Sequence, residues 1–442
     1  MILERRQFMK IERSSQILVN EEKISNQSRK TTTKIGKKKI ITPCYMSKIK
    51  TPSEIDLICD EKKINDVHQG IFFDLTDIGI INREKKVVAT AQQRLIPKIT
   101  FDFRMLKEII PIFIDPNIEY FYFKNIQKRT KYRNLLGLPR PIQEMLNIKD
   151  AETHDKKWLD LNKNGGDNTF INWCIREQNK YQPDAILPPV PFISDEESLL
   201  VDLAIDINKK SSFTIADVNN LEPSFLFSLN YMALRDLDQL TKISDFIMDS
   251  DNDFDNVRLV FIKIKNFVET DTDGIRNLGI FTRKLRDATK INEKCVFLID
   301  ADSYGIVSIA NGIDGFCEPL DGFTREYLPR RKKGKRYITY GEWYNRTKMK
   351  SDKFKKIKDK NLNCSCPVCK HINENFIINE KNIDVITWNR WRKEHLFYSR
   401  CDEVTEIRKL IDKNEIMKII DKFSHSAHKP FLEILGLYSE DG

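Results

Sequence analysis

The sequence predicts an α/β protein built on a (β/α)8 barrel, and two patterns carry this prediction. Short apolar runs rich in Val, Ile and Phe recur over residues 98–320 without alternating with polar residues. Such runs are typical of strands buried on both faces of a parallel sheet. They lie roughly 25–60 residues apart, which leaves room for a crossover helix each time. About seven or eight such units favour a closed barrel over the alternative, a doubly wound sheet.

The expected strands follow one another along the chain and are joined by helical stretches. Residues 274–289 carry an apolar stripe at helical spacing, and residues 404–423 carry another. No GxGxxG or P-loop motif follows any strand, which removes the usual reason to prefer a nucleotide-binding sheet. The strands are expected at 98–103, 118–123, 185–193, 225–231, 258–265, 295–300 and 312–320.

Composition divides the 442-residue chain into three parts. Residues 1–34 are polar and are expected to form a flexible leader, residues 35–340 the barrel, and residues 341–442 a basic insertion, a metal-binding subdomain and C-terminal helices. The leader has no apolar core typical of a secretory signal, and no run is long enough to span a bilayer. The nine cysteines are mostly isolated, which suits a reducing compartment. We therefore expect a cytoplasmic protein without a membrane partner.

The positive charge is concentrated in one block. Residues 325–360 contain 15 Lys and Arg against four acids, a net charge of +11 in a chain whose total is +9. Clustered charge of this kind, interleaved with aromatic residues, favours a nucleic-acid partner, and a solvated lysine-rich loop is the alternative. The residues expected to contact nucleic acid are Arg330, Arg331, Lys332, Lys333, Lys335 and Arg336.

A cysteine cluster follows the basic block. Cys364, Cys366 and Cys369 form a CxCxxC unit whose short spacing can direct three thiolates to one point. His371 is too close to Cys369 to complete the site without an awkward chain reversal, so His395, at the start of an expected helix, is the better fourth ligand. Cys401 is a weaker competitor. A closed Cys3His site has no open position for water, so the expected cofactor is a structural Zn²⁺.

These residues resemble the zinc signature of the tRNA-guanine transglycosylases. The histidine lies 26 positions after Cys369, as Glu394-His395, and the sequence CSCPVC is similar to the archaeal branch and its relatives that act on DNA. Residues 36–58, with Thr42-Pro43-Cys44-Tyr45-Met46, are similar to the hairpin and Thr-Pro-x-Phe-Met segment of the family. The NGIDGF segment at 311–316 resembles the Gly-x-Asp-x-Phe that precedes the family's nucleophile. The resemblance implies a zinc-bearing (β/α)8 barrel.

The catalytic residues implied by the resemblance are only partly present. The position of the family's nucleophilic aspartate falls on Cys317. The family's Asp-Ser-Gly-Gly-Phe-Gln loop is missing, and the nearest place in this sequence offers only Asp102. Carboxylates suit capture of an oxocarbenium-like centre, so Glu318 is the expected nucleophile, with Asp321 as an alternative and with Asp300 or Asp102 as acid/base. An adjacent strand residue such as Glu318 normally points to the opposite face, however. Other polar candidates at strand ends, each with a structural alternative, are Asn230, Lys263, Lys265 and Asp302.

Two functions therefore remain open from the sequence. The first is a pentosyltransferase that exchanges guanine for a 7-deazaguanine in tRNA or DNA through a covalent glycosyl intermediate. The second is a catalytically inactive relative that binds nucleic acid or serves as a partner subunit in a homo- or heterodimer. A zinc-ribbon nucleic-acid binder with an unrelated barrel is a third and weaker reading, because it leaves the segment at 42–46 unexplained.

Overall fold

The computed structural model describes most of the chain between residues 32 and 418. The described residues are 32–35, 38–49, 54, 57–58, 66–75, 110–118, 138–148, 151–195, 199–216, 222–249, 254, 257–265, 271–292, 294–320, 342–346, 350–357, 362–376, 378, 382–412 and 418.

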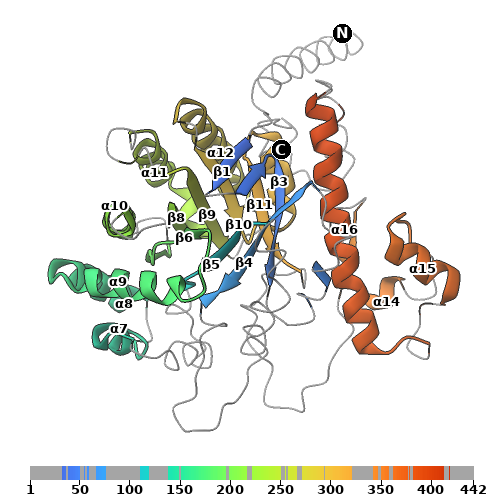
Figure 1. Cartoon of the computed structure of the whole chain (residues 1–442), viewed down its shortest axis with the longest axis horizontal. Coiled ribbons are helices and arrows are strands. Elements are labelled where there is room, and N and C mark those ends of the chain that lie inside the picture. Colours follow the sequence, from blue (N-terminus) through green and yellow to red (C-terminus); the bar gives the residue numbers. More distant parts are fainter. Residues whose placement is uncertain are drawn as a thin grey trace, which may run out of the picture.

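A closed barrel of eight parallel strands forms the centre of the molecule (Figure 1). Strand β3 pairs with β4 on one side and β11 on the other, and closure comes from the pairing of β6 with β8. The short β7 lies beside β8 as an additional strand. In chain order the strands are β3 (Cys44–Ile49), β4 (His68–Asp74), β5 (Ile112–Asp115), β6 (Ala185–Ile186), β7 (Phe192–Ile193), β8 (Glu222–Asn230), β9 (Leu259–Lys265), β10 (Cys295–Ile299) and β11 (Gly315–Pro319).

Aromatic side chains fill the middle of the barrel. Phe72 and Phe113 stack at 4.9 Å between ring centroids, and Phe261 meets both at 5.4 and 5.3 Å. Phe297 continues the group at 5.7 Å from Phe261. Gly70 packs closely beside this layer, since a Cβ there would lie 2.9 Å from the Met46 sulfur and 3.2 Å from the Phe113 ring. The barrel is therefore a packed core, and only its ends can carry chemistry.

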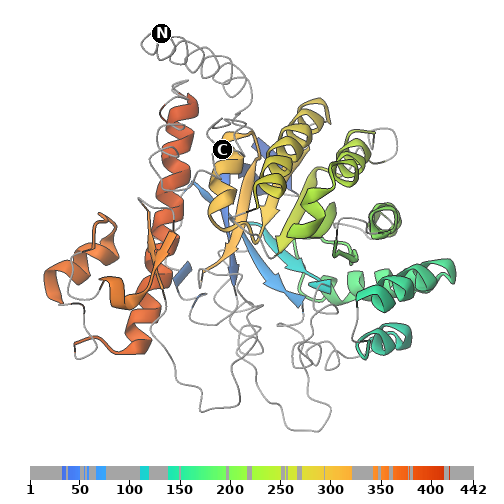
Figure 2. The same cartoon turned by 180° about the vertical axis from the view of Figure 1, so that it is seen from behind.

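Helices cover the outside of the barrel, and most of them lie on the side away from α16 in both views, whereas α13 packs against α16 (Figures 1 and 2). They lie between successive strands, as expected for βα units, and three of them (α7, α8 and α9) follow one another between β5 and β6. They are α7 (Arg140–Met145), α8 (Ala151–Lys163), α9 (Gly166–Asn179), α10 (Leu200–Ala216), the 3₁₀ turn η2 (Tyr231–Arg235), α11 (Leu237–Asp249), α12 (Thr272–Asn292) and α13 (Asp302–Ala310).

The long helix α16 (Val385–Asp412) joins the barrel to a second, smaller core. Its second half packs Phe397, Val404 and Ile407 into the barrel core. Its first half places Trp388 in a separate cluster with residues of β12 (Trp343–Asn345), β13 (Lys350–Asp352), α14 (Phe354–Ile357) and α15 (Pro367–Asn375). One helix thus serves two cores, and the smaller one contains the predicted metal ligands Cys366 and Cys369.

A hairpin precedes the barrel, as the sequence led us to expect. Strand β1 (Thr32–Ile35) pairs antiparallel with β2 (Lys38–Ile41), so the expected leader at 1–34 ends inside β1. Arg408 of α16 ties this region to the helix, since its guanidinium donates hydrogen bonds to the carbonyl oxygens of Pro43, Asp66 and Ile41 at 2.5–2.9 Å.

The predicted closed barrel is confirmed, and the last four predicted strands correspond to β8, β9, β10 and β11. The run at 185–193 contains two short strands separated by a proline-rich segment instead of one. Helix α12 contains the predicted helix, but α16 begins ten residues before His395, so the expectation that His395 begins a helix was wrong. The expected strand at 98–103, and all but the first residue of the one at 118–123, lie outside the described residues. No helix in the described part is both long and apolar enough to cross a membrane.

Candidate functional site

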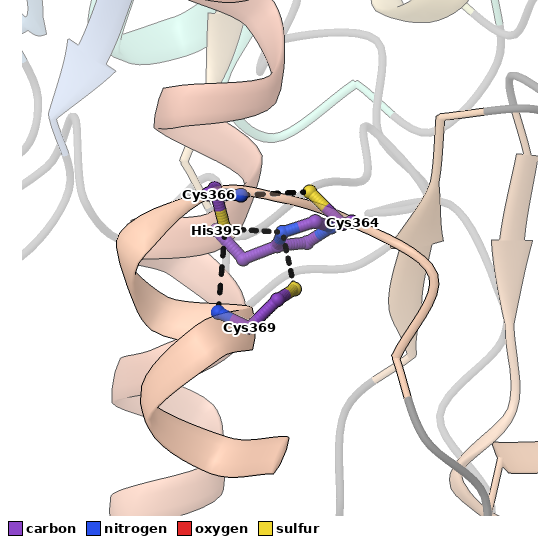
Figure 3. Close-up of side chains that lie close together, drawn as sticks. All are labelled: Cys364, Cys366, Cys369 and His395. Atoms are coloured by element: carbon purple, nitrogen blue, oxygen red, sulfur yellow. Dashed lines mark hydrogen bonds between the residues drawn. The ribbon is translucent and has the colours of Figure 1, made fainter. Parts of the chain in front are cut away.

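The four predicted metal ligands come together between α15 and α16 (Figure 3). Cys364 precedes α15, Cys366 is its N-cap, Cys369 lies in its first turn, and His395 projects from α16. Their ligand atoms all lie within 4.8 Å of one another. The backbone N–H groups of Cys366 and Cys369 donate to the sulfurs of Cys364 and Cys366, each at 3.4 Å, which favours thiolates.

The geometry of the cluster fits a tetrahedral ion. His395 Nδ1 lies 3.3 Å from the Cys366 sulfur and 3.4 Å from the Cys369 sulfur. Bond lengths of about 2.3 Å to sulfur and 2.0–2.1 Å to nitrogen would place such ligand atoms roughly 3.5–3.8 Å apart. Only a small adjustment is therefore needed for this group of four to hold a metal ion.

The surroundings of His395 fix which ring nitrogen faces the sulfurs. Its Nε2 lies 2.8 Å from the Tyr344 carbonyl oxygen, so Nε2–H donates there and Nδ1 is left as the ligand atom. Trp343 stacks on the imidazole at 4.5 Å with an interplanar angle of 14°. His371, the rejected ligand, is exposed and contacts Asn375, and Cys401 lies in the barrel core.

A second cluster of charged side chains lies inside the barrel at the carboxyl ends of its strands. We call it the barrel-mouth cluster, and all its members are buried. Active-site groups of barrel enzymes come from this end. The cluster consists of Lys48 of β3, Asp74 of β4, Asp115 of β5, Lys263 and Lys265 of β9, and Asp300, which directly follows β10.

Lysine ammonium groups pair with all three carboxylates. Lys48 Nζ lies 2.8 Å from Asp74, 3.2 Å from Asp115 and 3.5 Å from Asp300. Lys263 reaches Asp115 at 2.5 Å, and Lys265 pairs with Asp300. Three cations and three anions balance, which is how buried charges are tolerated.

The lysines decide the charge state of two carboxylates. Burial alone would raise the pKa of Asp115, but the ammonium groups of Lys263 and Lys48 outweigh burial and hold that pKa below its ordinary value. Burial likewise opposes ionisation of Asp300, while Lys265, Lys48 and Lys263 lower its pKa. Both carboxyl groups are therefore ionised at neutral pH and cannot donate a proton.

Asp300 differs from the other two carboxylates in its backbone conformation and in the contacts of its Oδ1 atom. Its φ is 60°, a left-handed conformation that is uncommon outside glycine and that clusters at functional sites. Its Oδ2 meets the two lysines, whereas its buried Oδ1 has neither a hydrogen bond nor an ion pair to the described residues. Asp74 Oδ1 also lacks a hydrogen bond, but it lies 2.8 Å from the Lys48 ammonium group. One oxygen of this ionised carboxylate is thus buried and keeps lone pairs that no described group uses.

Cys317 of β11 faces the same cluster. It is fully buried, and burial together with the negative charge of Asp300 raises the pKa of its thiol well above the ordinary value. Cys317 is therefore a neutral thiol, which is a weak nucleophile.

Glu318 faces the opposite way, as strand alternation predicts. Its carboxylate accepts hydrogen bonds from Arg400 of α16 at 2.6 and 3.2 Å. Arg400 also donates to Glu403 and to the Tyr344 hydroxyl, at 3.0 and 2.7 Å. All of these groups are buried, so Glu318 links the barrel to the helix that carries His395 and lies away from the mouth.

The other predicted residues are only partly placed. Asn230, at the end of β8, donates to the Ser194 carbonyl oxygen at 2.7 Å. Asp302 begins α13, and its side chain is outside the described part. Also outside it are Asp102, Asp321 and the basic residues Arg330, Arg331, Lys332, Lys333, Lys335 and Arg336.

Lys48, Asp74 and Asp115 were missed from the sequence. A signal was present, because three apolar runs each end in aspartate: IFFD at 71–74, IFID at 112–115 and FLID at 297–300. All three aspartates stand at the carboxyl ends of barrel strands. The repeated pattern could have marked the mouth once the first two runs were recognised as strands.

Comparisons of the chain with protein-family models and with curated proteins found no match.

Proposed function

We propose that this protein is a base-exchange transglycosylase that acts on nucleic acid and replaces guanine with a 7-deazaguanine. The observation that carries the proposal is Asp300: an ionised carboxylate at a barrel strand end, held by lysines through one oxygen and with the other oxygen unpaired. The sequence resemblance to tRNA-guanine transglycosylases supplies the reaction class. Asp300 takes the nucleophilic role first expected of Glu318, because Glu318 is engaged by Arg400.

The proposed chemistry balances with the groups at the mouth. Asp300 Oδ1 attacks the sugar C1′ while the bond from C1′ to guanine breaks, and a lysine ammonium group of the cluster provides the proton that the leaving base takes up. The incoming base then attacks C1′, loses its ring N–H proton to the lysine and releases the Asp300 carboxylate. A target nucleotide in a duplex must leave the stack before C1′ can reach the mouth.

The metal in this proposal is Zn²⁺ with a structural role. Three thiolates and one imidazole are the ligand set that zinc prefers in closed sites, and four protein ligands leave no position for a reacting water. Bound zinc would hold α15 against α16 and so stabilise the smaller core. The chemistry at the mouth does not involve it.

One experiment tests the enzyme. The protein is incubated with end-labelled tRNA or guanine-containing DNA plus a 7-deazaguanine, and covalent adducts are resolved on a denaturing gel. We expect an adduct with the unmodified protein, at least a 1,000-fold loss of exchange with Asp300→Asn, and activity within a few-fold for Glu318→Gln variants that fold. Full exchange by Asp300→Asn would contradict the assignment.

The alternative function, a non-catalytic nucleic-acid-binding or partner subunit, has a specific observation in its favour. The family's nucleophile position holds the neutral thiol of Cys317, and each mouth carboxylate is neutralised by lysine. Nucleic-acid binding without adduct or base exchange on any of these substrates would support this alternative. Cys317→Ser tests a third possibility. If the adduct is lost in that variant alone, the Cys317 thiol is the nucleophile.

A further inference from the structure

A pocket of about 480 Å³ lies beside the metal cluster and is separate from the barrel mouth. Its walls come from the β12–β13 hairpin, from α14, from the loop that carries Cys364 and from His395 of α16. Ile357 and Leu362 provide apolar surface, while Asn345, Asn363 and Asp352 provide hydrogen-bonding groups. A volume of this size suits a small organic ligand.

The charge of the pocket favours an anion. Arg346 is already neutralised by Asp402 and Glu406 of α16. Asp352 contributes one negative charge and accepts a hydrogen bond from Asn345 at 3.0 Å, so the two lysines of the lining outnumber it. By contrast Lys355 and Lys356 are exposed, and neither has an acidic partner within the described part of the chain. Two adjacent ammonium groups at the rim are therefore available for phosphate oxygens.

The uncharged groups point to a ligand larger than phosphate. Asparagine side chains offer both a donor and an acceptor, which matches the edges of nucleobases. Asn363 is exposed on the loop before Cys364, Asn345 is the last residue of β12, and both line the pocket. The apolar side chains Ile357 and Leu362 can cover a flat heterocycle.

The location suits a nucleic-acid strand that also enters the mouth. Both views place α14 and α15 on the same side of the barrel as α16 (Figures 1 and 2). Strand β11, which carries Cys317 at the mouth, is the strand that precedes the hairpin in the chain. A nucleic-acid strand bound at the mouth can therefore extend toward the smaller core.

We infer that this pocket binds one nucleotide of the substrate strand, outside the reacting nucleotide, with Lys355 and Lys356 at its phosphates and Asn345 and Asn363 at its base. This inference rests on the proposed function only in that the partner is a nucleic acid. The metal cluster then has a second consequence, because it sets the position of one pocket wall through Cys364.

The test compares two charge-matched double variants of the full chain. Lys355→Gln/Lys356→Gln removes both proposed phosphate contacts, and Lys370→Gln/Lys409→Gln removes two exposed lysines outside the pocket. Affinity for labelled 12-nucleotide single-stranded DNA and RNA is measured over a salt series. We expect the pocket variant to bind about tenfold more weakly and the slope of log K against log salt to fall by about 1.4, which corresponds to two phosphates. Equal behaviour of the two variants would overturn the inference.

Two further measurements separate a nucleotide from a bare phosphate. Asn363→Ala should lower affinity several-fold with an unchanged salt slope. Guanosine monophosphate should compete with the strand at concentrations where inorganic phosphate does not, and equal competition would overturn the base contact. Metal content, measured for every variant, shows that the subdomain is intact. The binding assay and the adduct assay can fail separately. The pocket variants should still form adducts when the nucleic-acid strand is saturating, and Asp300→Asn should still bind the strand.

Discussion

The metal cluster and the barrel-mouth cluster are both buried assemblies of chemically active side chains, but they are encoded differently. The four metal ligands lie between residues 364 and 395, and three of them share one turn at the start of α15. At the mouth, Lys48 contacts Asp300 across 252 residues of chain. The metal cluster depends on a local turn and one helix, whereas the mouth exists only when the whole barrel closes. Changes at the two sites should therefore have different consequences.

The largest effect is expected from loss of a metal ligand. Structural zinc sites contribute about 10–16 kcal/mol of binding free energy in small domains. Cys369→Ser should reduce metal affinity by more than 100-fold and unfold the smaller core, while the barrel keeps its own core. Metal analysis and tryptophan fluorescence measure this, since Trp343 and Trp388 belong to that core.

Cys401→Ser is the matched control for the metal prediction. Cys401 is a buried cysteine on the same helix as His395 but packs in the barrel core. This variant should keep one metal ion per chain. Full metal occupancy in Cys369→Ser, or equal metal loss in the two variants, would contradict the assignment of the cluster.

A smaller effect is expected from the ion pair that joins the two regions. Arg400→Met leaves the buried carboxylates of Glu318 and Glu403 without their cation. Breaking a buried pair in this way costs about 3–5 kcal/mol. Urea unfolding should show this loss, and Arg400→Met/Glu318→Gln should lose less than the sum of the single variants. A loss below about 1 kcal/mol for Arg400→Met would show that the pair contributes little.

The sequence predicted the cluster of three cysteines and His395 because the cysteines lie so close in the chain that one turn brings their sulfurs together. It predicted the barrel because the strands at 225–231, 258–265 and 295–300 are unbroken apolar runs. It failed at the mouth for a physical reason: which residues of distant strands meet depends on sheet register, and β4 and β5 were not recognised as strands. Glu318 was chosen by its nearness in sequence to Cys317, although strand alternation sends the two side chains to opposite faces.

The smallest and most diagnostic effect concerns pH. Asp115 and Asp300 have native pKa values below their ordinary value, so the stability they contribute is present above the unfolded pKa of about 3.9 and is lost as pH falls toward the native pKa. Lys48 is one of the cations that lower both values. Lys48→Met should therefore be less stable than the unmodified protein by roughly 1–3 kcal/mol at pH 7, and the difference should shrink below about pH 4. A packing defect alone would give a difference independent of pH. Urea unfolding at pH 7, 5 and 3 distinguishes the two, and a constant difference would mean that Lys48 fills space in the mouth without setting its charge.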